Sequence, residues 1–226
     1  MANKIPDVLL NDGRVMPALG MGTSNSVAKS YEEVKNALQL GYRHINITGS
    51  DELVGIRHAI EESEIPRHKI FITAKVHIFA NMSRVISNIL LILGGTYVDL
   101  YLMVWEPYER LLGLSSAWSA MERIKRGGQA KSIGVANMGI SDLSIITETA
   151  EYFLPAINQV ELQPTYPQND LLPWTKEQGI VTSSYGPLDS LSRIIDQQRL
   201  PLVAPKSTLQ KMGRKYKSSV AAIVLR

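Results

Sequence analysis

The apolar residues of this chain follow two alternating patterns, one typical of strands and the other typical of helices. Short apolar segments rich in β-branched and aromatic residues predict seven strands, at residues 18–23, 42–48, 70–76, 99–105, 131–137, 156–162 and 180–186. Segments with apolar residues at helical spacing predict helices between them, at residues 30–41, 52–63, 83–93, 116–128, 141–153 and 171–179.

The two ends of the chain add a hairpin and a helix. Asn-Asp-Gly at residues 11–13 lies between two apolar runs and predicts a tight hairpin turn. Residues 208–226 predict one last helix. Strand and helix units that alternate about every 30 residues indicate a parallel sheet wrapped by helices. We therefore expect an α/β fold, with a (β/α)8 TIM-type barrel as the first choice and a doubly wound open sheet as the second.

Composition narrows the class of protein. The chain has 226 residues, of which 45% are hydrophobic and 20% charged, and it contains no evident linker. A single domain over residues 1–226 is therefore expected. The net charge of +3 comes from scattered basic residues, which argues against nucleic-acid binding. No apolar run approaches the roughly 18 residues of a membrane span, so no membrane partner is expected.

The inventory of possible metal ligands is poor. The chain has no cysteine, which excludes disulfides and thiolate metal sites and suits a cytoplasmic location. No histidine pair has metal-ligand spacing, and no carboxylate cluster suggests magnesium. We therefore expect no metal site.

In a barrel of this type the C-terminal ends of the strands form the active site. The polar or aromatic residues at these ends are Thr23, Asn46, Lys75, Trp105, Glu106, Asn137, Gln159, Glu161, Ser184 and Tyr185. We expect Asn46, Lys75, Asn137, Gln159 and Tyr185 to line one common cavity at the mouth of the barrel. His44 and His77 are expected to point away from the barrel axis, as structural histidines.

Several segments together resemble the aldo-keto reductase family. They are "MPALGMGT", "GYRHIN", "IFITAKV", "YVDLYLMVW", "AKSIGVAN", "AINQVELQP" and "GIVTSSYGPL", in the order and at about the spacing of that family. The resemblance covers nearly the whole chain. It implies a barrel that binds NADPH and reduces small carbonyl compounds through a tyrosine acid. In the family a lysine, an aspartate and a histidine support that tyrosine.

At the catalytic positions the resemblance is only partial. Lys75 occupies the position of the family's lysine, whereas Asn46 stands at the aspartate position and Val104 at the histidine position. The loop after Asn46 is about three residues shorter than in the family and lacks the tyrosine. Without the aspartate, the pKa of Lys75 is expected to fall if the site is dry. Glu106 is either a replacement acid or a solvated loop residue, and Tyr108 is another stand-in for the phenol.

The positions that hold the cofactor in the family match better. Asn137 and Gln159 match the pair that binds the nicotinamide carboxamide, and Tyr185 matches the ring that stacks on the nicotinamide. Gly22 and Thr23 match the turn beneath it. The family continues with an eighth strand and a phosphate-binding cluster, whereas here "VAPKST" at residues 203–208 precedes the last helix. The eighth unit of the barrel is therefore expected to be incomplete.

These observations lead to a first functional hypothesis and to alternatives. The first is an NADPH-dependent oxidoreductase with a remodelled active site. Its substrate is expected to be a small but bulky carbonyl metabolite, since residues 105–114 are rich in large side chains. The alternatives on the same barrel are a non-redox enzyme, such as an isomerase, cyclase or lyase, and a ligand-binding protein without turnover. The oligomeric state stays open.

Overall fold

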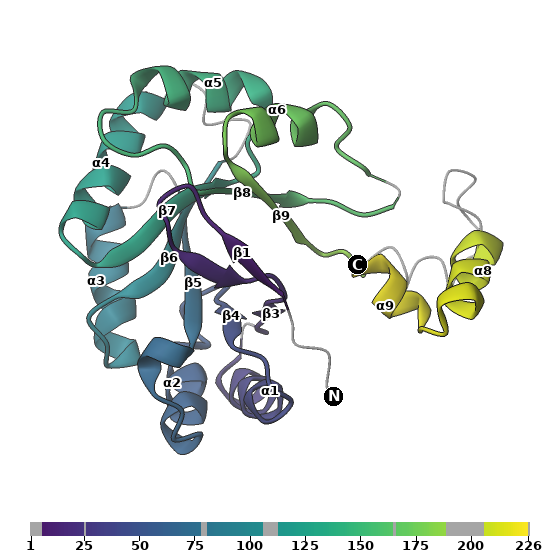
Figure 1. Cartoon of the computed structure of the whole chain (residues 1–226). Coiled ribbons are helices and arrows are strands. Elements are labelled where there is room, and N and C mark those ends of the chain that lie inside the picture. The colour runs from purple at the N-terminus through teal and green to yellow at the C-terminus, as the bar shows by residue number, and fades with distance from the viewer. Residues whose placement is uncertain are drawn as a thin grey trace.

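A computed structural model describes residues 6–24, 26–77, 81–105, 113–164, 166–188 and 206–225. Its centre is a parallel sheet of seven strands that curls into a half-barrel (Figure 1). The strands lie in chain order, as β3 (Met21–Gly22), β4 (His44–Asn46), β5 (Phe71–His77), β6 (Val98–Val104), β7 (Ala130–Ala136), β8 (Ile157–Glu161) and β9 (Val181–Tyr185). The seven predicted strands and the barrel-type fold are confirmed.

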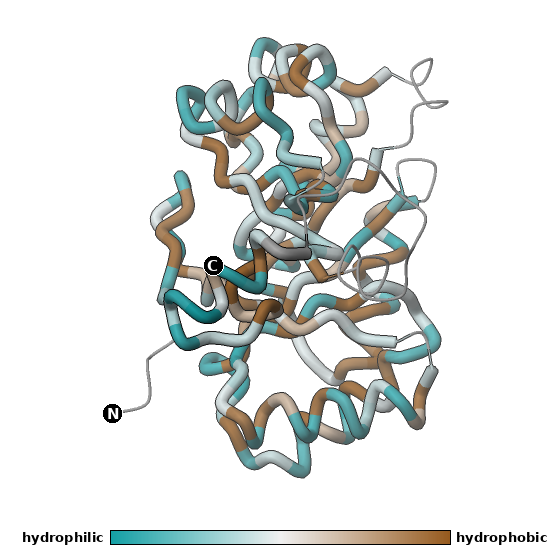
Figure 2. Tube along the Cα trace, turned by 90° about the vertical axis from the view of Figure 1, so that its right-hand side faces the viewer, coloured by the Kyte–Doolittle hydropathy of each residue, from teal (hydrophilic) through white to brown (hydrophobic). Residues whose placement is uncertain are grey.

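Helices cover the outer, convex face of the sheet (Figure 1). They are α1 (Val27–Gln39), α2 (Leu53–Glu62), α3 (Met82–Leu93), α4 (Leu114–Arg126), α5 (Ile140–Thr149) and α6 (Leu171–Glu177), with a short 3-10 helix η1 (Arg67–Lys69). Along these helices apolar and polar turns alternate in Figure 2, as expected for helices with one buried face. Local signals fix their ends, as in α3, where Asn81 accepts a hydrogen bond from the Arg84 N–H at 3.0 Å.

An antiparallel hairpin closes one end of the half-barrel. It consists of β1 (Asp7–Leu9) and β2 (Val15–Pro17), joined by the predicted Asn-Asp-Gly turn. Leu10 and Met16 pack with inward-facing residues of the sheet, namely Phe71, Leu100, Leu102 and Ile157. The opposite end of the half-barrel, at the C-terminal ends of the strands, is the one that carries the polar residues.

Alternation along each strand decides which side chains reach the barrel interior. In β5, Ile72 and Val76 belong to the apolar cluster beneath the helices, whereas Thr73 and Lys75 lie on the inner face. The expectation that His44 points away from the axis is wrong. His44 has the same strand parity as Asn46 and lines the same cavity, and its Nε2 lies 2.8 Å from the Thr73 hydroxyl.

The last predicted helix is divided into two. The structure has α8 (Lys206–Tyr216) and α9 (Val220–Val224), separated by Lys217 with a left-handed φ of 50°. Ser219 then starts α9 by accepting a hydrogen bond from the Ala222 N–H at 3.1 Å. The Lys-Ser-Ser sequence is thus a helix stop followed by a new cap, which apolar periodicity alone did not reveal.

Two further sequence expectations concern membranes and metals. None of the helices in the described ranges has the length and apolar character needed to span a membrane. Within the same ranges, no group of three histidine or carboxylate side chains is arranged to hold a metal ion.

Candidate active site

The inner face of the sheet brings together polar residues that are far apart in the sequence. Asn46 pairs in register with Thr73, so Lys75 lies one inward-facing position further along the neighbouring strand. Across the interior, the Asn46 Nδ2 donates a hydrogen bond of 3.4 Å to the Gln159 Oε1. The Asn46 Oδ1 is buried and has no hydrogen-bond partner. An unpartnered acceptor of this kind costs free energy unless a donor from a ligand or from water satisfies it.

A cavity of about 620 Å³ opens between β3 and β9, beside this amide pair. Four of the predicted site residues line it, namely Gly22, Asn46, Gln159 and Tyr185. Apolar side chains from the hairpin, β9 and α9 form much of the remaining wall, including Met16, Val181 and Val224. Its volume and its mixture of apolar wall and few polar groups are typical of a small-molecule site.

The expectation of one common cavity is only partly correct. Asn137 lines a different cavity, of about 780 Å³, which also includes Tyr185. Asn137 is exposed and has a left-handed φ of 63°, a conformation that asparagine tolerates better than most residues. Its N–H donates to the Gln159 carbonyl at 2.9 Å, so the backbone of the two residues is joined although their side chains face different spaces. Tyr185 and Pro167 line both cavities.

Lys75 lies against the ring of Tyr185. Its Nζ is 5.4 Å from the ring centroid, within the range of a cation–π contact. Burial lowers the pKa of Lys75, and the negative charge of Glu52 opposes this shift. The lowered pKa agrees with the sequence-based expectation. No described residue forms a salt bridge with Lys75.

Thr23 and Gly22 contribute to the site in different ways. Thr23 is buried, and its hydroxyl donates to the Asn46 carbonyl at 3.3 Å, while its own carbonyl accepts from the Thr48 hydroxyl at 3.1 Å. Thr23 therefore joins β3 to the loop after β4. A Cβ atom built on Gly22 would meet nothing within 4 Å, so the space above this residue is open.

The other residues expected at the mouth have different surroundings. The Trp105 Nε1 donates to the Asp142 carboxylate at 3.0 Å, and Trp105 belongs to the apolar cluster beneath the helices, so its placement at the mouth was wrong. Ser184 lines the same cavity as Asn46, and its hydroxyl donates to the Leu162 carbonyl at 2.7 Å. Val104, at the family's histidine position, is buried and supplies no polar group. Glu106 and Tyr108 lie outside the described residues.

Sequence reasoning missed one charged residue near the site. Glu52, at the N-terminal end of α2, is completely buried. It accepts hydrogen bonds from the Thr48 and Gly49 N–H groups, and the Thr48 hydroxyl, which can donate either to it or to the Thr23 carbonyl, lies 3.0 Å from its Oε2. The signal was present in the sequence, since a glutamate just before an apolar helix often caps the preceding loop.

Comparison with known proteins agrees with this geometry. The model of the aldo/keto reductase family matches residues 16–226 of the chain. The chain belongs to the aldo/keto reductase family. It is therefore related to oxidoreductases that act on small carbonyl compounds.

Several relatives within the family match most of the chain. An aldo-keto reductase of Mycobacterium sp. (strain MCS) is 38% identical over 208 residues, which cover 88% of this chain and 72% of the relative. A NAD/NADP-dependent indole-3-acetaldehyde reductase of Schizosaccharomyces pombe is 36% identical over 194 residues, covering 79% and 67%. The crystal structure of an aldo/keto reductase from Brucella melitensis superposes with a TM-score of 0.82 at 33% identity, covering 99% of this chain and 84% of that one.

Proposed function

We propose that this aldo/keto reductase family member is an NADPH-dependent oxidoreductase with a remodelled active site that reduces a small, bulky carbonyl metabolite. The observation that carries the proposal is the position of Lys75 against Tyr185, beside a cavity that contains the Asn46–Gln159 pair. A ring and two amides thus line the cavity, and the Lys75 ammonium contacts that ring. The Schizosaccharomyces relative, which is named for nicotinamide dinucleotides and for an aldehyde, supports the same reading.

The nicotinamide end of the cofactor fits the residues that are present. The buried Asn46 Oδ1, which lacks a partner, would accept a hydrogen bond from a carboxamide N–H, and the Gln159 amide lies beside it. Tyr185 borders the same cavity and offers a ring face for stacking. When bound, the reduced dinucleotide supplies the hydride.

Lys75 would perform the part of the chemistry that the family assigns to its tyrosine. Its ammonium group would polarise the carbonyl oxygen of the substrate and donate a proton as an alkoxide forms there. Burial lowers the pKa of Lys75, which makes its ammonium group a stronger acid than that of a free lysine. Water would then return the proton to the amine. Because a lysine replaces the phenol in this role, we expect slow reduction of simple aldehydes.

The test combines binding and turnover. NADPH and NADH are titrated by fluorescence, and consumption of each is followed with simple aldehydes and with bulky ketones, with alcohol product measured in parallel. We expect tighter binding of NADPH, a kcat below about 1 per second on simple aldehydes, and faster turnover on a bulky carbonyl. Binding of NADPH without consumption on any carbonyl would favour the non-redox or binding-only alternatives. Absence of binding would overturn the proposal.

A further inference from the structure

Two acceptor oxygens that lack a hydrogen-bond partner among the described residues belong to one cavity. They are the Asn46 Oδ1 and the Gln163 Oε1, and both residues line the cavity of about 620 Å³. A buried acceptor without a donor costs free energy, and a ligand in the cavity can supply the donor. The proposed function assigns the Asn46 oxygen to the nicotinamide carboxamide. The Gln163 oxygen is then left for the second ligand, the substrate.

The amide group of Gln163 is held in one orientation. Its Nε2 donates to the Glu161 carboxylate at 2.8 Å, and an ionised carboxylate only accepts hydrogen bonds, so the two ends of the amide are fixed. Glu161 lines the neighbouring cavity of about 780 Å³ and does not line the cavity of Asn46. The donor end of Gln163 is therefore committed to Glu161, and its acceptor end remains for a ligand of the cavity of Asn46.

The backbone of Gln163 is fixed as well. The Tyr166 N–H donates to the Gln163 carbonyl at 2.8 Å, and the Gln163 N–H donates to the Tyr166 carbonyl at 3.3 Å. The Gln163 Oε1 is buried, but the last torsion of a glutamine side chain is broad rather than confined to narrow wells. A small rotation of the amide therefore brings this oxygen to a ligand without rearrangement of the loop.

The cavity also lacks formal charge on its described lining. None of the described residues that line it is an aspartate, a glutamate, a lysine or an arginine. His44 lines it, and burial lowers the pKa of this imidazole, which favours the neutral form. Lys75 contacts the ring of Tyr185 without lining the cavity itself. A carboxylate bound here would lose hydration and face two acceptor oxygens, which is unfavourable.

We propose that Gln163 is a specificity-determining residue whose Oε1 accepts a hydrogen bond from a hydroxyl or N–H group of the substrate. The ligand selected in this way is an uncharged carbonyl compound that carries such a donor. It is preferred both to the analogue with a methyl group in place of the donor and to the analogue with a carboxylate. That the ligand is a carbonyl compound rests on the proposed function, but the preference itself can be measured by binding alone.

The test compares three aldehydes that differ in one substituent, namely meta-hydroxybenzaldehyde, meta-methylbenzaldehyde and meta-carboxybenzaldehyde. Ligand-detected NMR gives their dissociation constants with and without NADP⁺, which cannot reduce them, and kcat/KM is measured separately with NADPH. We expect the hydroxyl compound to bind at least about 10-fold more tightly than the methyl compound, which leaves the Gln163 oxygen unpaired. The carboxylate compound should bind most weakly.

Two glutamine variants separate the acceptor from the loop. Gln163→Met removes the acceptor and keeps the length of the side chain, so the hydroxyl compound should lose its advantage over the methyl compound. Gln168→Met is the matched control, because the Gln168 Nε2 donates to the Glu161 carbonyl at 3.0 Å but Gln168 lines the neighbouring cavity. The advantage should be unchanged in this control. Circular dichroism confirms that both variants are folded.

The possible outcomes separate the inference from the proposed function. A parent protein that binds the hydroxyl compound no more tightly than the methyl compound would overturn the inference, and so would tightest binding of the carboxylate compound. An advantage that is retained in Gln163→Met, or lost to the same extent in both variants, would also overturn it. The expected order of dissociation constants in a protein that reduces none of the aldehydes would retain the inference and reject the proposed function.

Discussion

Two buried glutamates hold two loops of this protein in nearly the same way. The Glu122 Oε1 accepts hydrogen bonds from the N–H groups of Glu151, Tyr152 and Phe153, at 3.1, 2.7 and 2.9 Å. The Glu52 Oε1 accepts from two successive N–H groups of the loop after β4. Both carboxylates thus accept hydrogen bonds from backbone N–H groups that have no partner within their own turn.

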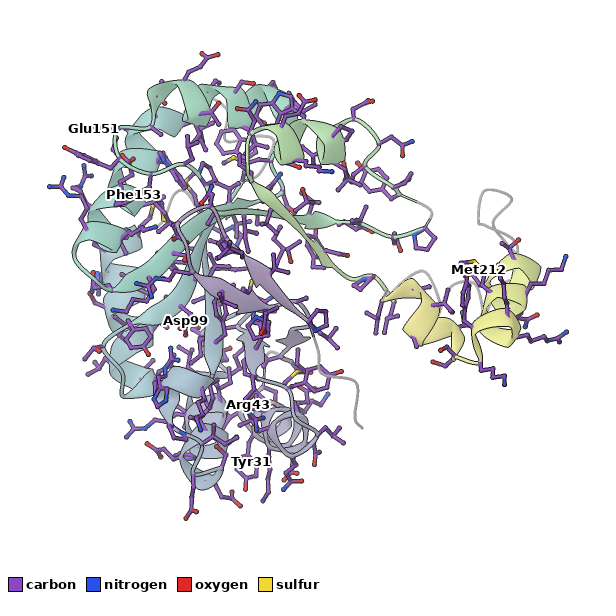
Figure 3. All side chains as sticks on the ribbon, in the orientation of Figure 1. Tyr31, Arg43, Asp99, Glu151, Phe153 and Met212 are labelled. Atoms are coloured by element: carbon purple, nitrogen blue, oxygen red, sulfur yellow. The ribbon has the colours of Figure 1, made fainter. Side chains whose placement is uncertain are left out.

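The surroundings of the two carboxylates differ. Glu151 and Phe153 lie beside α4 and α5 (Figure 3), whereas α2, which follows Glu52, lies near the other end of the half-barrel (Figure 1). The loop held by Glu122 carries aromatic rings with Lys125 and Arg126 stacked on them, at 4.4 Å each. Glu52 instead holds the loop that follows the site residue Asn46 at the end of β4. The same hydrogen-bond chemistry therefore holds a purely structural loop in one place and a loop that borders the candidate site in the other.

The largest expected effect is on stability, at the purely structural loop. Glu122→Ala leaves three N–H groups without their acceptor and is expected to lower the free energy of unfolding by about 3 kcal/mol. Urea denaturation measures the change. Glu122→Gln retains an acceptor oxygen and should cost less than half as much. Equal losses for the two variants would mean that the charge of Glu122, rather than its hydrogen bonds, holds the loop.

The next effect concerns activity at the mouth. Lys75→Met is expected to lower kcat/KM at least about 100-fold, or about 2.7 kcal/mol, because it removes the group proposed to stabilise charge on the substrate oxygen. The fold should be retained, since no hydrogen bond or salt bridge of the described residues depends on the Lys75 amine. Steady-state kinetics and a thermal melt test both points. Full activity in Lys75→Met would leave the mouth as a binding pocket only.

A smaller loss of stability is expected at the loop after β4. Glu52→Ala removes an acceptor for two N–H groups, and should cost about 2 kcal/mol in urea denaturation. Unlike Glu122→Ala, it should also lower kcat/KM, because the loop that Glu52 holds borders the candidate site. A loss of stability without any change in kcat/KM would make the two loops equivalent.

The smallest expected effect is on the pH dependence of stability. Burial lowers the pKa of Lys75, so the native protein releases this proton at a lower pH than the unfolded chain. Between the two pKa values the unfolded chain binds more protons, and the free energy of unfolding rises with pH. Lys75→Met should remove this rise, whereas Glu122→Gln should keep it. Urea denaturation at pH values from neutral to about 10 gives the free energy of unfolding as a function of pH. The same dependence on pH in the parent protein and in Lys75→Met would contradict the expectation.

Local pattern was enough to predict most of the fold. The seven strands and the hairpin turn follow from alternation and turn residues, both of which act within a few neighbours. The break between α8 and α9 escaped prediction, because Lys217 adopts a left-handed conformation that its residue type does not signal. The inward direction of His44 was available from strand parity, since it lies two residues before Asn46 on the same strand.

The sequence by itself determined which residue types stand at the strand ends: Lys75 on β5, Asn46 on β4 and a valine at the family's histidine position. Only the tertiary structure decided what these residues face. It brought Asn46 to Gln159 across 113 positions, turned Trp105 toward Asp142, and buried Glu52 against the loop after β4. The reason is physical: periodicity depends on neighbours along the chain, whereas burial and Coulomb interactions depend on distance in space.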